Sequence, residues 1–207
     1  MSEETRRQRL REIDQMREEG VEPYPYRFEK THWAGDIKNE FSTLENSQTK
    51  EDVEIRTAGR VMALRSHGKS SFFVLRDDTG RIQAYIRLDS VGKDSFEIFK
   101  KYVNIGDFVG VTGFPFKTHT GEVSVFAKSF EILSKSIRTM PEKWHGLKDK
   151  EIIYRQRYAE MLSSDEALNR FKIRSELFRL IREFLAQRRF IEVDTPMLLH
   201  LTGGASA

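Results

Sequence analysis

Two neighbouring stretches of this sequence place an aromatic ring, an amide and arginines at alternating positions. With a period of two, Phe72, Arg81, Gln83 and Tyr85 fall on one side of the strands predicted at 71–76 and 81–88. Aromatic rings stack on unpaired bases, and amides can hydrogen-bond to base edges. The pattern therefore predicts a nucleic-acid-binding face. The alternative is that Phe72 only shields the mouth of a barrel.

Composition permits nucleic-acid binding without requiring it. The 207 residues carry 35 Lys and Arg against 32 Asp and Glu, a net charge of +3, and the pI is about 9.0. There is no cysteine, and the five histidines lack paired ligand spacing, so we expect no metal site. No apolar run approaches the roughly 18 residues of a membrane span, and the acidic N-terminus is unlike a signal peptide. We therefore expect a cytoplasmic protein without membrane contact.

The N-terminal region, residues 1–50, is expected to be a helical extension. Leu10, Ile13 and Met16 form a thin apolar stripe that predicts an amphipathic helix over residues 2–19. A second, short helix is expected to start near Thr31. Its apolar positions are Trp33, Ile37, Phe41 and Leu44.

In residues 51–135 the apolar positions recur with a period of two, and this region is expected to form a five-stranded OB-fold barrel. The expected strands are 53–64, 71–76, 81–88, 107–116 and 122–130, with a helix over 94–102 and a candidate bulge at Gly59. Three strands, a helix and two strands is the order of an OB fold. A Greek-key sandwich needs more strands, and a ferredoxin-like fold begins with a strand followed by a helix.

The C-terminal region is expected to comprise a linker, 136–150, and the opening of a larger domain, 151–207. A helix over 151–162 is followed by a longer apolar helix, and then by a strand, 190–196, that ends at a proline. A lone strand after a long apolar helix lacks a sheet to join. A small appended subdomain is the alternative. The fold class predicted for the chain is α+β, mainly β with helices.

Several motifs carry a resemblance to a known family. Phe190 followed by Ile191–Leu198 resembles motif 1 of class II aminoacyl-tRNA synthetases. Together with Trp144–Leu147, Tyr154–Tyr158 and Gly203–Ala205, it makes nearly the whole chain resemble bacterial-type lysyl-tRNA synthetases, although Thr202 stands where many members have proline. The resemblance implies a helical arm, an OB-fold anticodon-binding domain and the first helices and strand of a catalytic domain. It also implies a homodimer formed through motif 1.

The resemblance implies roles for individual residues. Phe72 would stack on the central uridine of the tRNA(Lys) anticodon, Gln83 would hydrogen-bond to its edge, and Arg60 and Glu122 would contact neighbouring bases. On sequence alone, a glutamate that follows a turn is more often only solvated. Gly203, Gly204 and Ala205 match a loop that lines the lysine pocket.

The family's activity is to attach lysine to tRNA(Lys) for protein synthesis, with ATP and Mg²⁺ and through a lysyl-adenylate. Its motifs 2 and 3 lie downstream of residue 207, so no catalytic residue, metal ligand or cofactor is expected in this chain. Lysine and ATP are expected as partners of the full-length parent only. The chain alone is expected to bind tRNA but not to catalyse. Alternatives are a non-catalytic OB-fold RNA-binding paralogue and the equivalent piece of an aspartyl- or asparaginyl-tRNA synthetase.

Overall fold

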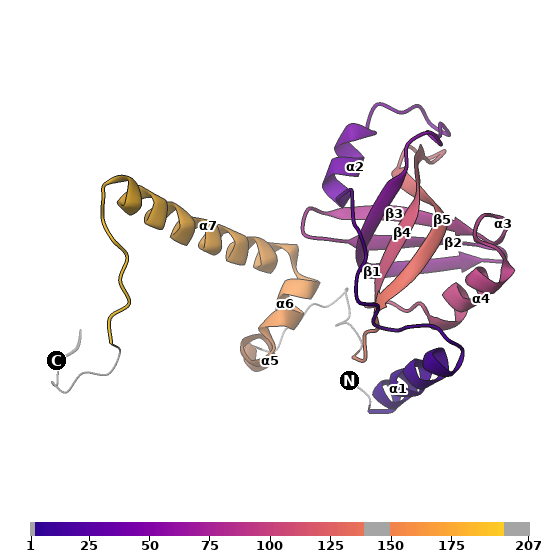
Figure 1. Ribbon diagram of the computed structural model, residues 1–207, viewed down its shortest axis with the longest axis horizontal. Coiled ribbons are helices and arrows are strands. Elements are labelled where there is room, and N and C mark those ends of the chain that lie inside the picture. Colours follow the sequence, from indigo (N-terminus) through magenta and orange to yellow (C-terminus); the bar gives the residue numbers. More distant parts are fainter. Residues whose placement is uncertain (1–2, 139–149, 197–207) are drawn as a thin grey trace. The chain divides into compact units, whose positions relative to one another are not determined.

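The chain divides into two compact units, Met1–Met140 and Pro141–Ala207. A computed structural model describes residues 3–138 and 150–196, coloured along the sequence in Figure 1. The first unit holds five strands and the helices that surround them, and the second is helical.

Five strands and four helices are described in the first unit. They are α1 (Glu3–Glu18), α2 (Ala34–Glu40), β1 (Ile55–His67), β2 (Ser70–Arg76), β3 (Arg81–Arg87), α3 (Leu88–Val91), α4 (Lys93–Tyr102), β4 (Phe108–Lys117) and β5 (Val123–Ser134). The predicted order of three strands, a helix and two strands is confirmed, with the short helix α3 as an additional element between β3 and α4. β1 and β5 extend three and four residues beyond their predicted ends, since they end at His67 and Ser134 rather than at 64 and 130.

The strands form a closed barrel in the order β1-β2-β3-β5-β4. β1 pairs antiparallel with both β2 and β4, and β5 pairs antiparallel with β4 and parallel with β3. Because closure pairs the first and last strands of the order, no strand is left with an open edge along its whole length. The predicted α+β fold with a five-stranded barrel is therefore confirmed.

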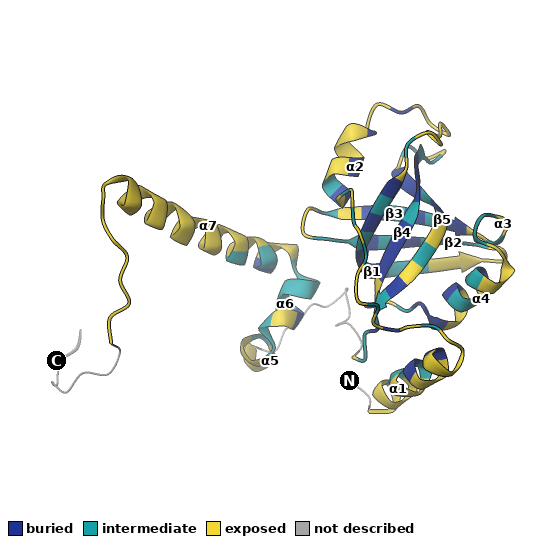
Figure 2. Ribbon diagram, in the orientation of Figure 1, coloured by how far each residue is buried: buried dark blue, intermediate teal, exposed yellow. Residues whose placement is uncertain are grey.

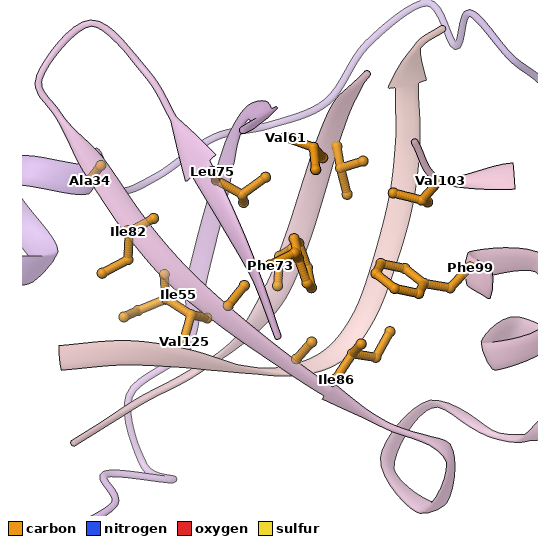
Figure 3. Close-up of a cluster of buried hydrophobic side chains, with 14 of the residues drawn as sticks. Ala34, Ile55, Val61, Phe73, Leu75, Ile82, Ile86, Phe99, Val103 and Val125 are labelled. Atoms are coloured by element: carbon orange, nitrogen blue, oxygen red, sulfur yellow. The ribbon is translucent and has the colours of Figure 1, made fainter. Parts of the chain in front are cut away.

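The inner face of the barrel is apolar, as the alternation predicts. Phe73, Leu75, Ile82 and Ala84 are each no more than 1% exposed. Phe99 of α4 packs against them, with its ring centroid 5.1 Å from that of Phe73 (Figure 3). Burying each large apolar side chain contributes about 1.5–3 kcal/mol. Since the inner positions of each strand are fixed by this core, the alternating positions must face outward.

The irregularity of β1 lies at Met62 rather than at Gly59, so the predicted bulge position is wrong. The register with β2 shifts between Val61 and Ala63. Gly59 has a different role, because a Cβ at that position would lie 2.8 Å from the carbonyl oxygen of Arg76. A side chain there would force the two strands apart.

The turn that joins β2 to β3 is fixed by the carboxylate of Asp77. This carboxylate accepts hydrogen bonds from the ammonium of Lys30 (2.7 Å) and the backbone N–H groups of Ala34 (2.8 Å), Thr79 (2.9 Å) and Gly80 (3.0 Å). Burial raises the pKa of Asp77, but these hydrogen bonds outweigh it and lower the pKa to about 2. Asp77 therefore ties the hairpin to the start of α2.

We expect Asp77 to make the first unit sensitive to acid. Its folded-state pKa of about 2 lies below its usual value of 3.8, so its contribution is complete above pH of about 4 and is lost as the pH falls toward 2. The shift corresponds to about 1–2 kcal/mol, discounted for partial solvent access. Asp77→Asn should lower the free energy of unfolding near neutral pH. On acidification to about pH 3, the variant should lose less unfolding free energy than the wild type, as measured by urea unfolding. The exposed Asp52→Asn is the control, and an equal acid loss in wild type and Asp77→Asn would contradict the assignment.

The second unit contains three described helices, α5 (Lys150–Arg155), α6 (Arg157–Ser163) and α7 (Asp165–Gln187). The helix predicted over 151–162 is wrong as a single element, because Gln156 has φ −122° and ψ 58°, outside the helical region. α7 is the longer apolar helix that the sequence predicted. The Ser164 side chain caps it by accepting a hydrogen bond from the N–H of Ala167 at 3.1 Å.

The apolar stripe of α7 is exposed within this chain, as Figure 2 shows. Phe178, Ile181 and Phe184 are 45%, 46% and 52% exposed. The strand predicted over 190–196 is not formed, because its backbone groups pair with no other strand in the described part of the chain. The predicted motifs at Trp144–Leu147 and Gly203–Ala205 lie outside the described residues.

Candidate nucleic-acid interface

Phe72 belongs to a row of outward-facing side chains that crosses the barrel from β1 to β5. The strand register places Arg65 opposite Phe72, Phe72 opposite Tyr85, and Tyr85 opposite Phe126. The Phe72 and Tyr85 rings stack with centroids 4.3 Å apart and planes at 26°. Phe126 contacts Tyr85 edge-on at 5.6 Å. One face of Phe72 therefore rests on a supported ring, which fixes the orientation of its side chain.

Gln83 lies in the adjacent row, between Val74 of β2 and Ser124 of β5. Its Nε2 donates a hydrogen bond to Glu122 Oε2 at 3.1 Å, and its Oε1 accepts one from the Ser124 hydroxyl at 3.1 Å. A primary amide has two N–H donors and two acceptor lone pairs. Each end of this amide therefore retains capacity for one ligand contact.

The loop between β4 and β5 holds Glu122 in place. The N–H of Thr118 donates to the carbonyl of Glu122, and the N–H of Glu122 donates to the Thr118 hydroxyl, both at 2.9 Å. Gly121 has φ +88°, a left-handed conformation that favours glycine. Asn46 Nδ2 donates to the carbonyl of His119 at 3.2 Å and ties the loop to the segment before β1.

An open cleft of about 430 Å³ lies between this loop and the sheet. It is lined by Ala63, Arg65, His67, Phe72, Phe73, Val74, Gln83, Thr118, His119 and Thr120. An aromatic ring, an amide, hydroxyls and a guanidinium around one open cleft are typical of sites for single-stranded nucleic acid.

Arg60 lies elsewhere on the barrel. Its register partners are Arg76 and Phe108. Its guanidinium lies 4.2 Å from the centroid of the Phe108 ring and donates a hydrogen bond to the carbonyl of Gly106 at 2.9 Å. Burial lowers the pKa of Arg60, and the nearby Asp107 partly opposes this. Arg60 is thus engaged with the loop before β4 rather than with the cleft.

The structure brings Phe72, Gln83 and Glu122 together and places Arg65, which the sequence prediction omitted, beside them. The signal for Arg65 was present in the hairpin. The turn at Gly68 and Lys69 pairs His67 with Ser70, and counting back from this pair places Arg65 opposite Phe72.

Residues 3–138 and 150–196 hold neither a metal-binding cluster nor a membrane-spanning helix. No group of three or more His, Asp or Glu side chains there is arranged to hold a metal ion. None of the helices in these ranges is both long and apolar enough to cross a membrane.

Comparison with known families assigns the two units separately. Residues 55–133 match the family described as OB-fold nucleic acid binding domain, and residues 149–207 match tRNA synthetases class II (D, K and N). The chain is therefore similar to an OB-fold nucleic-acid-binding domain followed by a class II tRNA synthetase segment.

Over its whole length the chain is similar to lysine–tRNA ligases. It is 58% identical over all 207 residues to the lysine–tRNA ligase of Thermosipho africanus and 55% identical over the same length to that of Thermotoga maritima. With the enzyme of Carboxydothermus hydrogenoformans it shares 46% identity over 199 residues. The chain spans 41%, 41% and 39% of these three relatives. The resemblance predicted from the motifs is confirmed.

Proposed function

We propose that this chain binds tRNA(Lys) by its anticodon, through the cleft beside Phe72 and Gln83. The observation that carries the proposal is the meeting of a ring stacked on Tyr85 with an amide held between two hydrogen-bond partners. Phe72 would stack on the central uridine, and Gln83 would pair with its edge. The OB-fold family match and the ligase relatives support the same function.

Arg65 replaces Arg60 as the basic residue of this site in our proposal. Arg65 lines the cleft and lies opposite Phe72, whereas the Arg60 guanidinium is occupied by Gly106 and Phe108. An arginine beside a stacked base can contact the adjoining phosphate or base edge.

The test compares anticodon stem-loops that carry UUU with stem-loops altered only at the central base. We expect the 207-residue chain to bind the UUU loop more tightly in a fluorescence-anisotropy titration, with affinity falling steeply as salt rises because phosphate contacts release counterions. Equal affinity for both loops would refute anticodon recognition. Binding without salt dependence would refute the phosphate contacts.

A matched pair of variants separates the two arginines. We expect Arg65→Ala to weaken binding to the UUU stem-loop about 5- to 100-fold and to reduce the salt dependence by about one phosphate contact. Arg60→Ala should leave affinity within about 2-fold, since its partners lie outside the cleft, and should instead lower thermal stability. A larger loss of affinity in Arg60→Ala than in Arg65→Ala would contradict this assignment.

The activity of the full-length protein is proposed from the relatives. It would be that of a lysine–tRNA ligase using ATP and Mg²⁺, acting in the cytoplasm as a homodimer through the apolar face of α7. ATP and Mg²⁺ are proposed as cofactors of the full-length protein only. Gly203, Gly204 and Ala205 would line part of the lysine pocket. We also propose a division of the chain into a helical extension (1–50), an OB-fold domain (51–135), a linker (136–150) and the start of a catalytic domain (151–207).

These 207 residues alone are proposed to bind tRNA without activating lysine. The chain corresponds to about two fifths of the relatives, and the site that we describe has the groups for base recognition. Lysine-dependent exchange of pyrophosphate into ATP is the measurement, and exchange above background would refute the proposal.

A further inference from the structure

Both ends of the Gln83 amide are hydrogen-bonded, to Glu122 and to Ser124. These two partners differ in whether they can donate a hydrogen bond. Glu122 is a carboxylate, which when ionised only accepts hydrogen bonds. The amide nitrogen must therefore face Glu122, because a carbonyl oxygen placed there would meet a second oxygen of negative charge. The Ser124 hydroxyl, whose residue is 0% exposed, then donates to the amide oxygen.

The orientation of the amide decides which pyrimidine it can recognise. Uracil presents an N3–H donor beside a carbonyl acceptor, whereas cytosine presents an N3 acceptor beside an amino donor. Turning a primary amide by about 180° exchanges its donor and its acceptor. A fixed amide therefore complements one of these bases and opposes the other, whereas an amide that turns freely complements both.

We infer that Glu122 is a positioning residue, which confers discrimination between uracil and cytosine by locking the orientation of Gln83. The inference rests on the proposed anticodon-binding function and deepens it. It replaces direct contact between Glu122 and a neighbouring base with an action through Gln83. The Ser124 hydroxyl, which can either donate or accept, donates to the amide oxygen in the orientation that Glu122 sets.

The loop geometry supports this role for Glu122. The carbonyl of Glu122 accepts a hydrogen bond from the Thr118 N–H, and the N–H of Glu122 donates to the Thr118 hydroxyl, so the position of its Cα relative to β5 is constrained. The Ser124 hydroxyl lies within 3.2 Å of the Glu122 carbonyl as well as 3.1 Å from Gln83 Oε1. Both partners of the amide therefore belong to one connected stretch, 122–124, which enters β5 beside Gln83.

The decisive variant is Glu122→Gln, which keeps the size of the side chain but can donate as well as accept. Because a glutamine at this position can face either end of the Gln83 amide, both orientations become available. We expect the wild type to prefer a central U over a central C by about 10- to 100-fold, as for a two-hydrogen-bond contact. In Glu122→Gln this ratio should fall to about 3-fold or less, mainly because the central-C loop binds better.

Three comparisons keep the inference separate from the proposed function. Glu131→Gln removes an equally exposed carboxylate from β5 and should leave the U-to-C ratio unchanged, which controls for charge. In a Gln83→Ala background, Glu122→Gln should cause no further loss of discrimination. Stem-loops changed at the first or third anticodon base should be distinguished equally well by wild type and Glu122→Gln.

Each result has a defined meaning. If the wild type does not prefer central U, the proposed function fails and the inference fails with it. If the wild type prefers U and Glu122→Gln keeps the full preference, the inference alone is overturned. Loss of discrimination at a neighbouring base, with the central ratio intact, would overturn it in favour of direct base contact by Glu122.

Discussion

Phe72→Ala is expected to weaken binding of the UUU stem-loop by about 5- to 150-fold, the equivalent of the 1–3 kcal/mol of one base–aromatic stack. The loss should be large within that range, because the ring is supported before the ligand arrives. Tyr85 stacks on Phe72 at 4.3 Å, and Phe126 supports Tyr85 from the next strand. Little conformational entropy is then spent on ordering the ring when a base binds.

The control for this variant is Tyr26→Ala, which removes a fully exposed aromatic ring outside the cleft. Its affinity should stay within about 2-fold of the wild type, which excludes nonspecific stacking on any exposed ring. The fold of Phe72→Ala is checked by circular dichroism and thermal unfolding. A folded Phe72→Ala variant with wild-type affinity would rule out stacking at this position.

The sequence was informative about Phe72 and Gln83 because alternation is a local property. Once Phe73, Leu75, Ile82 and Ala84 were assigned to the core, the residues between them had to face outward. The prediction needed no knowledge of how the barrel closes. The order of the strands along the sequence and the position of α4 were predicted from equally local changes in the period of the hydrophobic pattern.

The location of Arg60 was not predictable by the same reasoning. Its role was implied only by the resemblance, and its neighbours depend on β4, which is about 50 residues later and closes the barrel against β1. The irregularity at Met62 further shifts the register between Arg60 and the hairpin end that carries Arg65. Spacing along β1 therefore could not place Arg60, whereas the register of the hairpin places Arg65 opposite Phe72.

The C-terminal differences have another cause. The residues around 190–196 have the composition of a strand, but a strand is stabilised by pairing with a neighbour. Likewise, the apolar face of α7 has the width of a buried helix, and Phe178 is 45% exposed in this chain alone. Local pattern predicts the preference of such segments, whereas the described residues supply no strand that pairs with 190–196 and leave the apolar face of α7 exposed.

A second large effect is expected at a buried ion pair near the start of β4. Asp107 and Lys135 have side chains that are both 0% exposed, and the ammonium of Lys135 donates to the Asp107 carboxylate. The same carboxylate accepts hydrogen bonds from the backbone N–H groups of Ser136 at 2.7 Å and Asn104 at 2.9 Å. It therefore joins the end of β5 to the loop before β4.

Asp107→Ala is expected to lower the free energy of unfolding by about 3–5 kcal/mol, because it leaves a buried ammonium without its counterion. Burial already lowers the pKa of Lys135, and Asp107 is the principal charge that opposes this effect. Glu12 lies 3.9 Å from the ammonium and offers only a partial substitute.

The measurement is urea unfolding followed by circular dichroism, with Glu97→Ala as the matched control. Glu97 pairs with Lys93 at 4.0 Å, and both side chains are mostly exposed (65% and 76%). Removing that carboxylate should change stability by less than about 0.5 kcal/mol, because water and salt screen exposed pairs. If Asp107→Ala were no more destabilising than Glu97→Ala, the buried pair would not be what joins β5 to the loop before β4.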